Sequence, residues 1–200
     1  MEKIAPLLKT VPVILASGSP RRVRMLKAYG LDPIVIKPGC SEDIQTELKP
    51  HQLVMALSVR KNLCVSEMDL TEFLPEGTDD YLIISSDTIV SFEGQVLEKP
   101  VDEADACRML SMLSGKKHTV YTGCCVFHKA SADRLLFYDS TDVYFKPFGR
   151  DVIDAYVATG IPMDKAGAYG IQDGFGDQVR CLVGSEDTVI GFPLNELLTK

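Results

Sequence analysis

The sequence predicts an α/β fold in which helices flank a mixed central sheet. Short apolar, β-rich runs alternate with stretches of helical periodicity, which favours strands connected through helices. Two longer β-rich runs, at about 118–128 and 135–145, follow one another directly and indicate a hairpin in the same sheet. The chain of 200 residues is long enough to bury a sizeable core, and its length fits one domain, or one domain with a lobe.

The N-terminal segment predicts a strand, a turn and a helix in succession. The apolar run Val11–Ala16 predicts a buried strand, and Ser17–Gly18 predicts the turn. Ser19 is suited to cap a helix, and Pro20 is suited to its first position, where the missing N–H costs nothing. Gly30 then ends the helix.

The next segment predicts a second strand and a longer helix. A short strand is expected at Ile34–Ile36, followed by a polar loop that carries Glu42 and Asp43. A helix is expected from about Pro50 to Ser66. The acidic, irregular stretch 67–80 predicts a surface connection.

The middle of the chain carries the strongest strand signal, at Tyr81–Phe92. Glu93–Gly94 predicts a turn that leads into a returning segment, 95–100. Asp102 can cap the following helix, which has apolar residues at helical spacing and which Gly115 ends.

The C-terminal part predicts four further elements. They are a helix around Asp151–Ala158, a structured glycine-rich loop at 166–176, a strand at Val179–Val183 and a last helix at Leu194–Leu198.

Composition and charge exclude several classes of function. The formal net charge of −7 argues against general binding to nucleic acids or anionic membranes, since both need a basic surface. The six cysteines form no zinc-ligand spacing, so we expect reduced, mostly buried thiols in a cytoplasmic protein. No apolar run approaches about 20 residues, and the N-terminus lacks a signal-peptide pattern. The histidines, expected to be structural or exposed, are His51, His118 and His128.

One window of this acidic chain is basic. Residues 11–31 contain no Asp or Glu but include Arg21, Arg22, Arg24 and Lys27. Positive side chains at a helix start are mildly unfavourable, because the helix dipole already places partial positive charge there. A bound anion would offset this, and two guanidinium groups with a helix N-terminus suit a polyphosphate. The alternative is a basic surface helix with carboxylate partners elsewhere.

Lys61, Asp87 and Lys99 are the other charged candidates. Lys61 falls inside the apolar stripe of its predicted helix, so its ammonium either enters a cleft or extends to water from a packed stem. Asp87 follows an apolar run, where a rigid strand can hold a carboxylate for metal binding, for base catalysis or for capping a turn. The predicted hairpin returns Lys99 beside Asp87, so that the two residues could face one cleft.

The glycine-rich loop is a weaker candidate. Its glycines permit a ligand to approach the backbone closely, although a glycine-rich turn alone says little. Gln172 is the best polar candidate in this loop for contacting the edge of a base.

Five motifs, in this order, resemble the Maf family of nucleoside triphosphate pyrophosphatases. They are LASGSPRR at 15–22, SSDTIV at 85–90, VLEKP at 96–100, DKAGAYGIQ at 164–172 and GSEDTVIGFPL at 184–194. SSDTIV and GAYGIQ are similar to the branch that acts on dTTP and UTP. The resemblance implies a single domain over 1–200, similar in fold to inosine triphosphate pyrophosphatases, with two lobes around a cleft and often homodimeric.

The resemblance also implies an activity and a set of site residues. The reaction would be hydrolysis of a nucleoside triphosphate to the monophosphate and pyrophosphate with Mg²⁺ or Mn²⁺, a house-cleaning step of nucleotide metabolism. Asp87 and Glu42 would bind the metal, and Asp43 is the second choice for the place of Glu42. The implied catalytic residues are Asp87, Lys61, Lys99 and Glu42, and the implied substrate contacts are Ser17, Arg21, Arg22, Gln172 and Thr88.

Two alternatives stay open at this point. One is a nucleotide-binding regulator of cell division with little turnover. The other is a pyrophosphatase for another base, such as 7-methyl-GTP or inosine or xanthosine triphosphate.

Overall fold

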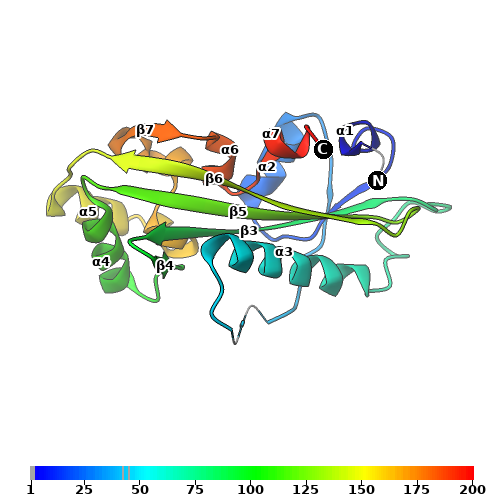
Figure 1. The fold of residues 1–200 in the computed structure, drawn as a ribbon, viewed down its shortest axis with the longest axis horizontal. Coiled ribbons are helices and arrows are strands. Elements are labelled where there is room, and N and C mark those ends of the chain that lie inside the picture. The colour runs from blue at the N-terminus through cyan, green and yellow to red at the C-terminus, as the bar shows by residue number, and fades with distance from the viewer. Residues whose placement is uncertain (1–2, 42, 45) are drawn as a thin grey trace. The chain divides into compact units, whose positions relative to one another are not determined.

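The computed structural model describes residues 3–41, 43, 44 and 46–200 (Figure 1). The chain forms two compact units. The first comprises Met1–Asp87, Thr122–Asp139 and Gly191–Lys200, and the second comprises Thr88–Tyr121 and Ser140–Ile190. Among the described residues, no helix combines the length and the apolar character that crossing a membrane requires.

Within the described part of the chain, the strands all belong to one mixed sheet, which confirms the predicted fold class. The strand order is β2-β1-β3-β5-β6-β7, and β4 pairs with β3. β1 runs parallel to both β2 and β3, whereas the pairs β3–β4 and β6–β7 are antiparallel. The strands are β1 (Val13–Leu15), β2 (Ile34–Val35), β3 (Leu82–Phe92), β4 (Gln95–Leu97), β5 (Lys117–His128), β6 (Arg134–Phe145) and β7 (Val179–Val183).

Helices cover both faces of the sheet in the first unit (Figure 1). Successive residues of β1 point to opposite faces. Leu15 packs in a cluster with residues of α1, α2 and α7, whereas Ile14 packs with Val65 of α3. Burial on both faces explains why β1 is a continuous apolar run. The helices of this unit are α1 (Ile4–Leu7), α2 (Pro20–Ala28), α3 (Pro50–Ser66) and α7 (Leu194–Leu197).

Local signals position α2 as predicted. Pro20 is its first residue and Ser19 its N-cap, although the Ser19 side chain makes no capping hydrogen bond. Gly30, with φ of +91°, follows the last turn and donates its N–H to the carbonyl of Lys27 at 2.9 Å. The left-handed backbone at this position favours glycine.

The second unit begins with a tight hairpin between β3 and β4. Glu93 and Gly94 both have positive φ, +50° and +84°, as a two-residue turn of the primed type requires. The Asp102 carboxylate accepts the N–H of Asp105 at 2.7 Å and so caps α4, as predicted. The helices of this unit are α4 (Glu103–Leu113), α5 (Arg150–Val157) and α6 (Glu186–Ile190).

The glycine-rich loop contains more regular structure than the sequence predicts. It folds into consecutive short helical turns, because glycines with positive φ at Gly167 and Gly174 let the chain reverse repeatedly. These turns are η1 (Ile161–Asp164), η2 (Ala166–Ala168), η3 (Ile171–Phe175) and η4 (Gly176–Gln178).

Two histidines serve the packing of their own units. His118 in the second unit is buried beside Phe145 and contacts the Tyr169 hydroxyl through Nε2 at 2.7 Å. Burial lowers the pKa of His118 to about 3, so the ring is neutral at physiological pH. In the first unit His128 Nε2 contacts Asp80 Oδ2 at 3.0 Å and ties the turn after β5 to the start of β3.

Candidate active site

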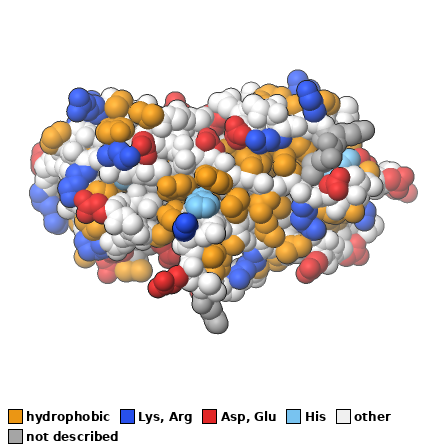
Figure 2. All heavy atoms as spheres, viewed as in Figure 1, with side chains coloured by type: hydrophobic (Ala, Val, Ile, Leu, Met, Phe, Trp, Pro, Cys, Tyr) orange, Lys and Arg blue, Asp and Glu red, His pale blue; other side chains and the backbone are white. Residues whose placement is uncertain are grey.

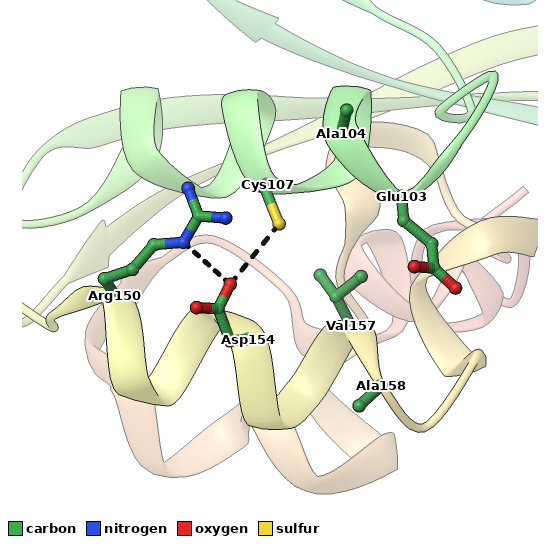
Figure 3. Close-up of a pocket in the computed structure, with 7 residues that line it drawn as sticks. All are labelled: Glu103, Ala104, Cys107, Arg150, Asp154, Val157 and Ala158. Atoms are coloured by element: carbon green, nitrogen blue, oxygen red, sulfur yellow. Dashed lines mark hydrogen bonds and ion pairs between the residues drawn. The ribbon is translucent and has the colours of Figure 1, made fainter.

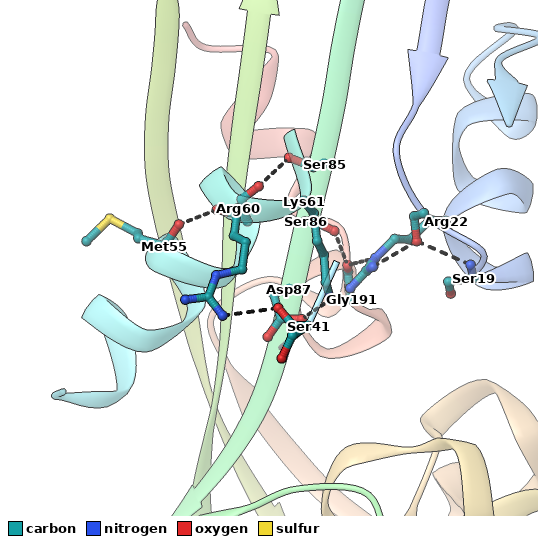
Figure 4. Close-up of polar contacts among 12 residues, drawn as sticks. Ser19, Arg22, Ser41, Met55, Arg60, Lys61, Ser85, Ser86, Asp87 and Gly191 are labelled. Atoms are coloured by element: carbon teal, nitrogen blue, oxygen red, sulfur yellow. Dashed lines mark hydrogen bonds and ion pairs between the residues drawn. The ribbon is translucent and has the colours of Figure 1, made fainter. Parts of the chain in front are cut away.

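A buried ion pair joins α3 and β3 in the first unit. Lys61 Nζ donates to Asp87 Oδ1 at 2.5 Å, and the two side chains are only 10% and 11% exposed. Figure 4 shows Lys61 of α3 and Asp87 of β3 meeting between the helix and the strand. Each charge compensates the other, because an isolated charge at this depth would be strongly disfavoured. The apolar-stripe position of Lys61 therefore leads to a paired ammonium, not to one that extends to water.

Polar contacts hold α3 against the sheet on either side of Lys61. Ser85 Oγ donates to the carbonyl of Ser58 at 2.7 Å, and Asn62 Nδ2 donates to the carbonyl of Ile83 at 2.9 Å. A Cβ at Gly123 of β5 would lie 2.4 Å from the carbonyl oxygen of Val54, so only glycine allows this close approach of strand and helix. These contacts fix the position of Lys61 relative to β3.

The turn between β1 and α2 is locked by Arg22. Arg22 Nη1 donates to Ser17 Oγ at 2.9 Å, and Arg22 Nε donates to the carbonyl of Gly191 at 2.8 Å. Ser17 is buried, and its Oγ also accepts the N–H of Ser19 at 3.2 Å. The Arg22 guanidinium is thus held in one orientation at the start of the helix.

The carbonyl of Gly191 connects this turn to β3 next to the ion pair. It accepts a second hydrogen bond from Ser86 Oγ at 3.0 Å, and Ser86 precedes Asp87 in β3 (Figure 4). Arg22 of α2 and Ser86 of β3 therefore share one backbone oxygen from the C-terminal segment. The sequence does not indicate Gly191 as a site residue. Its role comes from a backbone carbonyl that accepts two hydrogen bonds, and every residue has such a carbonyl.

Arg60 is a further residue that the sequence did not indicate. Its Nη1 donates to the carbonyls of Ser41 at 3.1 Å and Asp43 at 2.5 Å, so it holds these two residues of the polar loop beside α3. The Asp43 carboxylate is occupied locally, accepting from Ser41 Oγ at 3.1 Å. Glu42, the preferred carboxylate of this loop, lies outside the described residues.

The structure divides the predicted site residues between the two units. The first unit holds Arg21, half-buried in the first turn of α2, together with Ser17, Arg22, Lys61 and Asp87. The second unit holds Thr88, Lys99 and Gln172, of which Lys99 and Gln172 are exposed. Lys99 follows the end of β4 at Leu97, two residues beyond the last residue paired with β3.

Comparison with known proteins identifies the family. Residues 12–200 match the family described as Maf-like protein. The chain belongs to the Maf family. It is 42% identical over 195 residues to a dTTP/UTP pyrophosphatase of Agathobacter rectalis, covering 92% of this chain and 93% of the relative. It is 39% identical to a dTTP/UTP pyrophosphatase of Bacillus thuringiensis, covering 93% and 92%. A solved structure, that of the Staphylococcus aureus Ham1 protein, is only weakly similar, with 13% identity, a TM-score of 0.45 and coverage of 94% and 96%.

The family motifs supply most of the polar groups in the first unit. Ser17 and Arg22 belong to LASGSPRR, Ser86 and Asp87 to SSDTIV, and Gly191 to GSEDTVIGFPL. Three motifs distant in the chain thus meet through the Gly191 carbonyl.

The donor set is compatible with a magnesium-type ion. No group of three or more His, Cys, Asp or Glu side chains suitable for a metal occurs among the described residues. Magnesium is commonly held by one or two carboxylates together with substrate phosphates and water, not by a full cage of protein ligands. The carboxylate of Asp87, at a rigid strand position, fits that mode.

A surface cavity in the second unit lies apart from the predicted residues. It has a volume of about 350 Å³ and lies between α4 and α5 (Figure 3). Two of its charged groups pair with each other, since Arg150 Nε donates to Asp154 Oδ1 at 2.7 Å, and the Cys107 thiol contacts the same oxygen at 3.7 Å. None of the residues that line it belongs to the candidate site.

Proposed function

We propose that the protein hydrolyses dTTP and UTP to the corresponding monophosphate and pyrophosphate, with Mg²⁺ or Mn²⁺ as cofactor. The observation that carries the proposal is the buried Lys61–Asp87 pair, because it holds a carboxylate and an ammonium together in the SSDTIV segment of a Maf protein. The choice of dTTP and UTP follows the names of the relatives, which match over more than nine-tenths of their length.

The charges of the first unit suit attack of water at the α-phosphorus. Asp87 would hold the divalent ion or accept a proton from the attacking water, and Lys61 would hold this carboxylate in place through their ion pair. The ion would supply charge neutralisation at the phosphate oxygens. A second carboxylate for the ion would come from Glu42 or Asp43, and Arg60 binds the backbone carbonyl of Asp43.

Arg21, Arg22 and Ser17 would hold the phosphates at the start of α2. The first turn of α2 contains no acidic residue, so the positive end of the helix dipole adds to the two guanidinium charges. The anchoring of Arg22 to Ser17 and Gly191 limits its motion before substrate binds, which reduces the entropy lost on binding.

Residues of the second unit complete the proposal. Lys99 would stabilise negative charge that develops on the pyrophosphate. Thr88 would contact the substrate. Gln172 would contribute to base selection, because an amide both donates and accepts hydrogen bonds. The exposure of Lys99 and Gln172 leaves both side chains accessible to a ligand.

A substrate panel tests this function. The protein is incubated with dTTP, UTP, CTP, GTP, ITP and 7-methyl-GTP, first with the divalent metal removed by a chelator and then with Mg²⁺ or Mn²⁺ restored. We expect pyrophosphate release that requires metal and is fastest for dTTP and UTP. Absence of release from every nucleotide would exclude the enzyme and favour a nucleotide-binding regulator. Release from 7-methyl-GTP or ITP alone would assign a different base.

We further infer a homodimer in the cytoplasm. The six cysteines are free thiols, in keeping with a reducing compartment. Leu63 of α3 and Leu136 and Tyr138 of β6 are exposed, and apolar side chains are visible on the face in Figure 2. Such exposed apolar residues are common in interfaces between subunits. A monomeric mass by light scattering at micromolar concentration would contradict the dimer.

A further inference from the structure

A buried lysine organises the loop that carries Gln172. Lys165 is only 6% exposed, and its Nζ donates to the carbonyl of Ile161 at 2.7 Å and to Asp164 Oδ1 at 2.6 Å. Nζ also lies 3.3 Å from Asp173 Oδ2. The ammonium therefore ties together residues on both sides of the GAYG segment.

The two carboxylates around Lys165 are not equivalent. The Asp164 side chain is 62% exposed, whereas the Asp173 side chain is only 22% exposed. Water screens the first pair strongly, so the charge interaction with Asp173 is the less screened of the two. Asp173 is also the residue directly after Gln172. The pair therefore holds the backbone next to the side chain proposed to contact the base.

The backbone at Gly170 passes so close to Lys165 that a side chain there would clash. A Cβ at Gly170 would lie 2.7 Å from Lys165 Cε and 2.8 Å from Asp173 Oδ2, so the ion pair passes directly beneath this glycine. The Gly170 N–H donates to the Tyr156 hydroxyl at 3.1 Å, and the Asp173 N–H donates to the Gly170 carbonyl at 3.2 Å. Gln172 therefore lies between two anchored residues, Gly170 and Asp173.

We propose that the Lys165–Asp173 pair is a positioning device that sets the placement of Gln172 and thereby the discrimination between pyrimidine bases. This inference rests on the function proposed above. Uracil and thymine present an N3–H donor and an O4 acceptor, whereas cytosine presents an N3 acceptor and an N4 amino donor. The pair holds the backbone on either side of Gln172 and so limits the positions that its amide can reach to meet one of these patterns. On a looser backbone the amide could approach either base.

The test compares Asp173→Asn with Gln172→Ala, using Asp177→Asn as the matched control on the next, exposed turn. The readouts are the affinities for UMP and CMP by calorimetry, the kcat and KM for UTP and CTP, and the melting temperature. We expect Asp173→Asn and Gln172→Ala each to lower the UMP-to-CMP affinity ratio at least fivefold, with KM for UTP raised and kcat little changed. The double variant should be no worse than Gln172→Ala, and Asp173→Glu should recover part of the ratio.

Two outcomes would overturn the inference. One is an unchanged ratio in Asp173→Asn or in Gln172→Ala. The other is a loss in Asp173→Asn that lowers both affinities equally along with the melting temperature, which would make Asp173 purely structural. Absence of triphosphate turnover in the unmodified protein would instead defeat the proposed function, while the nucleotide affinities would still decide the role of the pair.

Discussion

Replacing Asp87 with asparagine should lower kcat for dTTP by about 10²–10⁴-fold, the range expected for removing a group that transfers a proton or stabilises the transition state. Asparagine keeps the size and hydrogen-bonding capacity of the side chain but loses the negative charge. The phosphate contacts at the start of α2 come from other residues, so KM should change by no more than about threefold.

The matched control is Asp32→Asn, which removes a carboxylate from an exposed ion pair with Lys27. It should leave kcat and KM unchanged. Arg22→Lys gives the opposite pattern, because lysine cannot reproduce the two contacts with Ser17 and Gly191: KM should rise while kcat falls less. If Asp87→Asn instead retained kcat, or lost activity only through a lower melting temperature, Asp87 would be a packing residue.

Replacing Lys61 with methionine should produce the largest loss of stability in the first unit. Methionine fills a similar volume but leaves the Asp87 carboxylate without its ammonium in a site where both side chains are about nine-tenths buried. Removing one partner of a buried pair costs about 3–5 kcal/mol, and the residual exposure places this variant toward the lower end. Turnover should be lost as well. Urea unfolding measures the free energy of unfolding.

A double variant separates the two effects. Lys61→Met combined with Asp87→Asn leaves no unpaired charge, so it should regain most of the stability while remaining inactive. Lys27→Met is the control, since its partner Asp32 is exposed and surface pairs contribute little. A Lys61→Met protein as stable as the unmodified one would show that the pair does not hold α3 to β3.

The sequence predicts the elements whose signals are local. The helix at Pro50–Ser66 and the turn at Glu93–Gly94 follow from apolar periodicity and turn chemistry, and both are confirmed. The sequence predicts neither α1 nor α6, although it predicts α7, which is equally short. α1 depends on distant contacts, such as the Ile4 N–H donating to the carbonyl of Lys200 at 3.3 Å.

The residues of the candidate site likewise divide into those that the sequence indicates and those that depend on distant contacts. Lys61 could be singled out because a charge within an apolar stripe is unusual, and the structure explains it through Asp87. Arg60 and Gly191 could not be singled out from the sequence. Arg60 donates to backbone carbonyls and Gly191 accepts through one, and every residue has such a carbonyl. Lys165 belongs to a family motif, yet its contacts depend on the folding of the loop around it.

Identifying which phosphorus–oxygen bond is broken tests the central claim most directly. The protein is supplied with dTTP and Mg²⁺ in H₂¹⁸O, and the products are identified by mass spectrometry. Attack of water at the α-phosphorus predicts dTMP carrying one ¹⁸O atom together with unlabelled pyrophosphate in equal amount. Formation of dTDP and labelled inorganic phosphate, or of unlabelled dTMP with labelled pyrophosphate, would contradict the account.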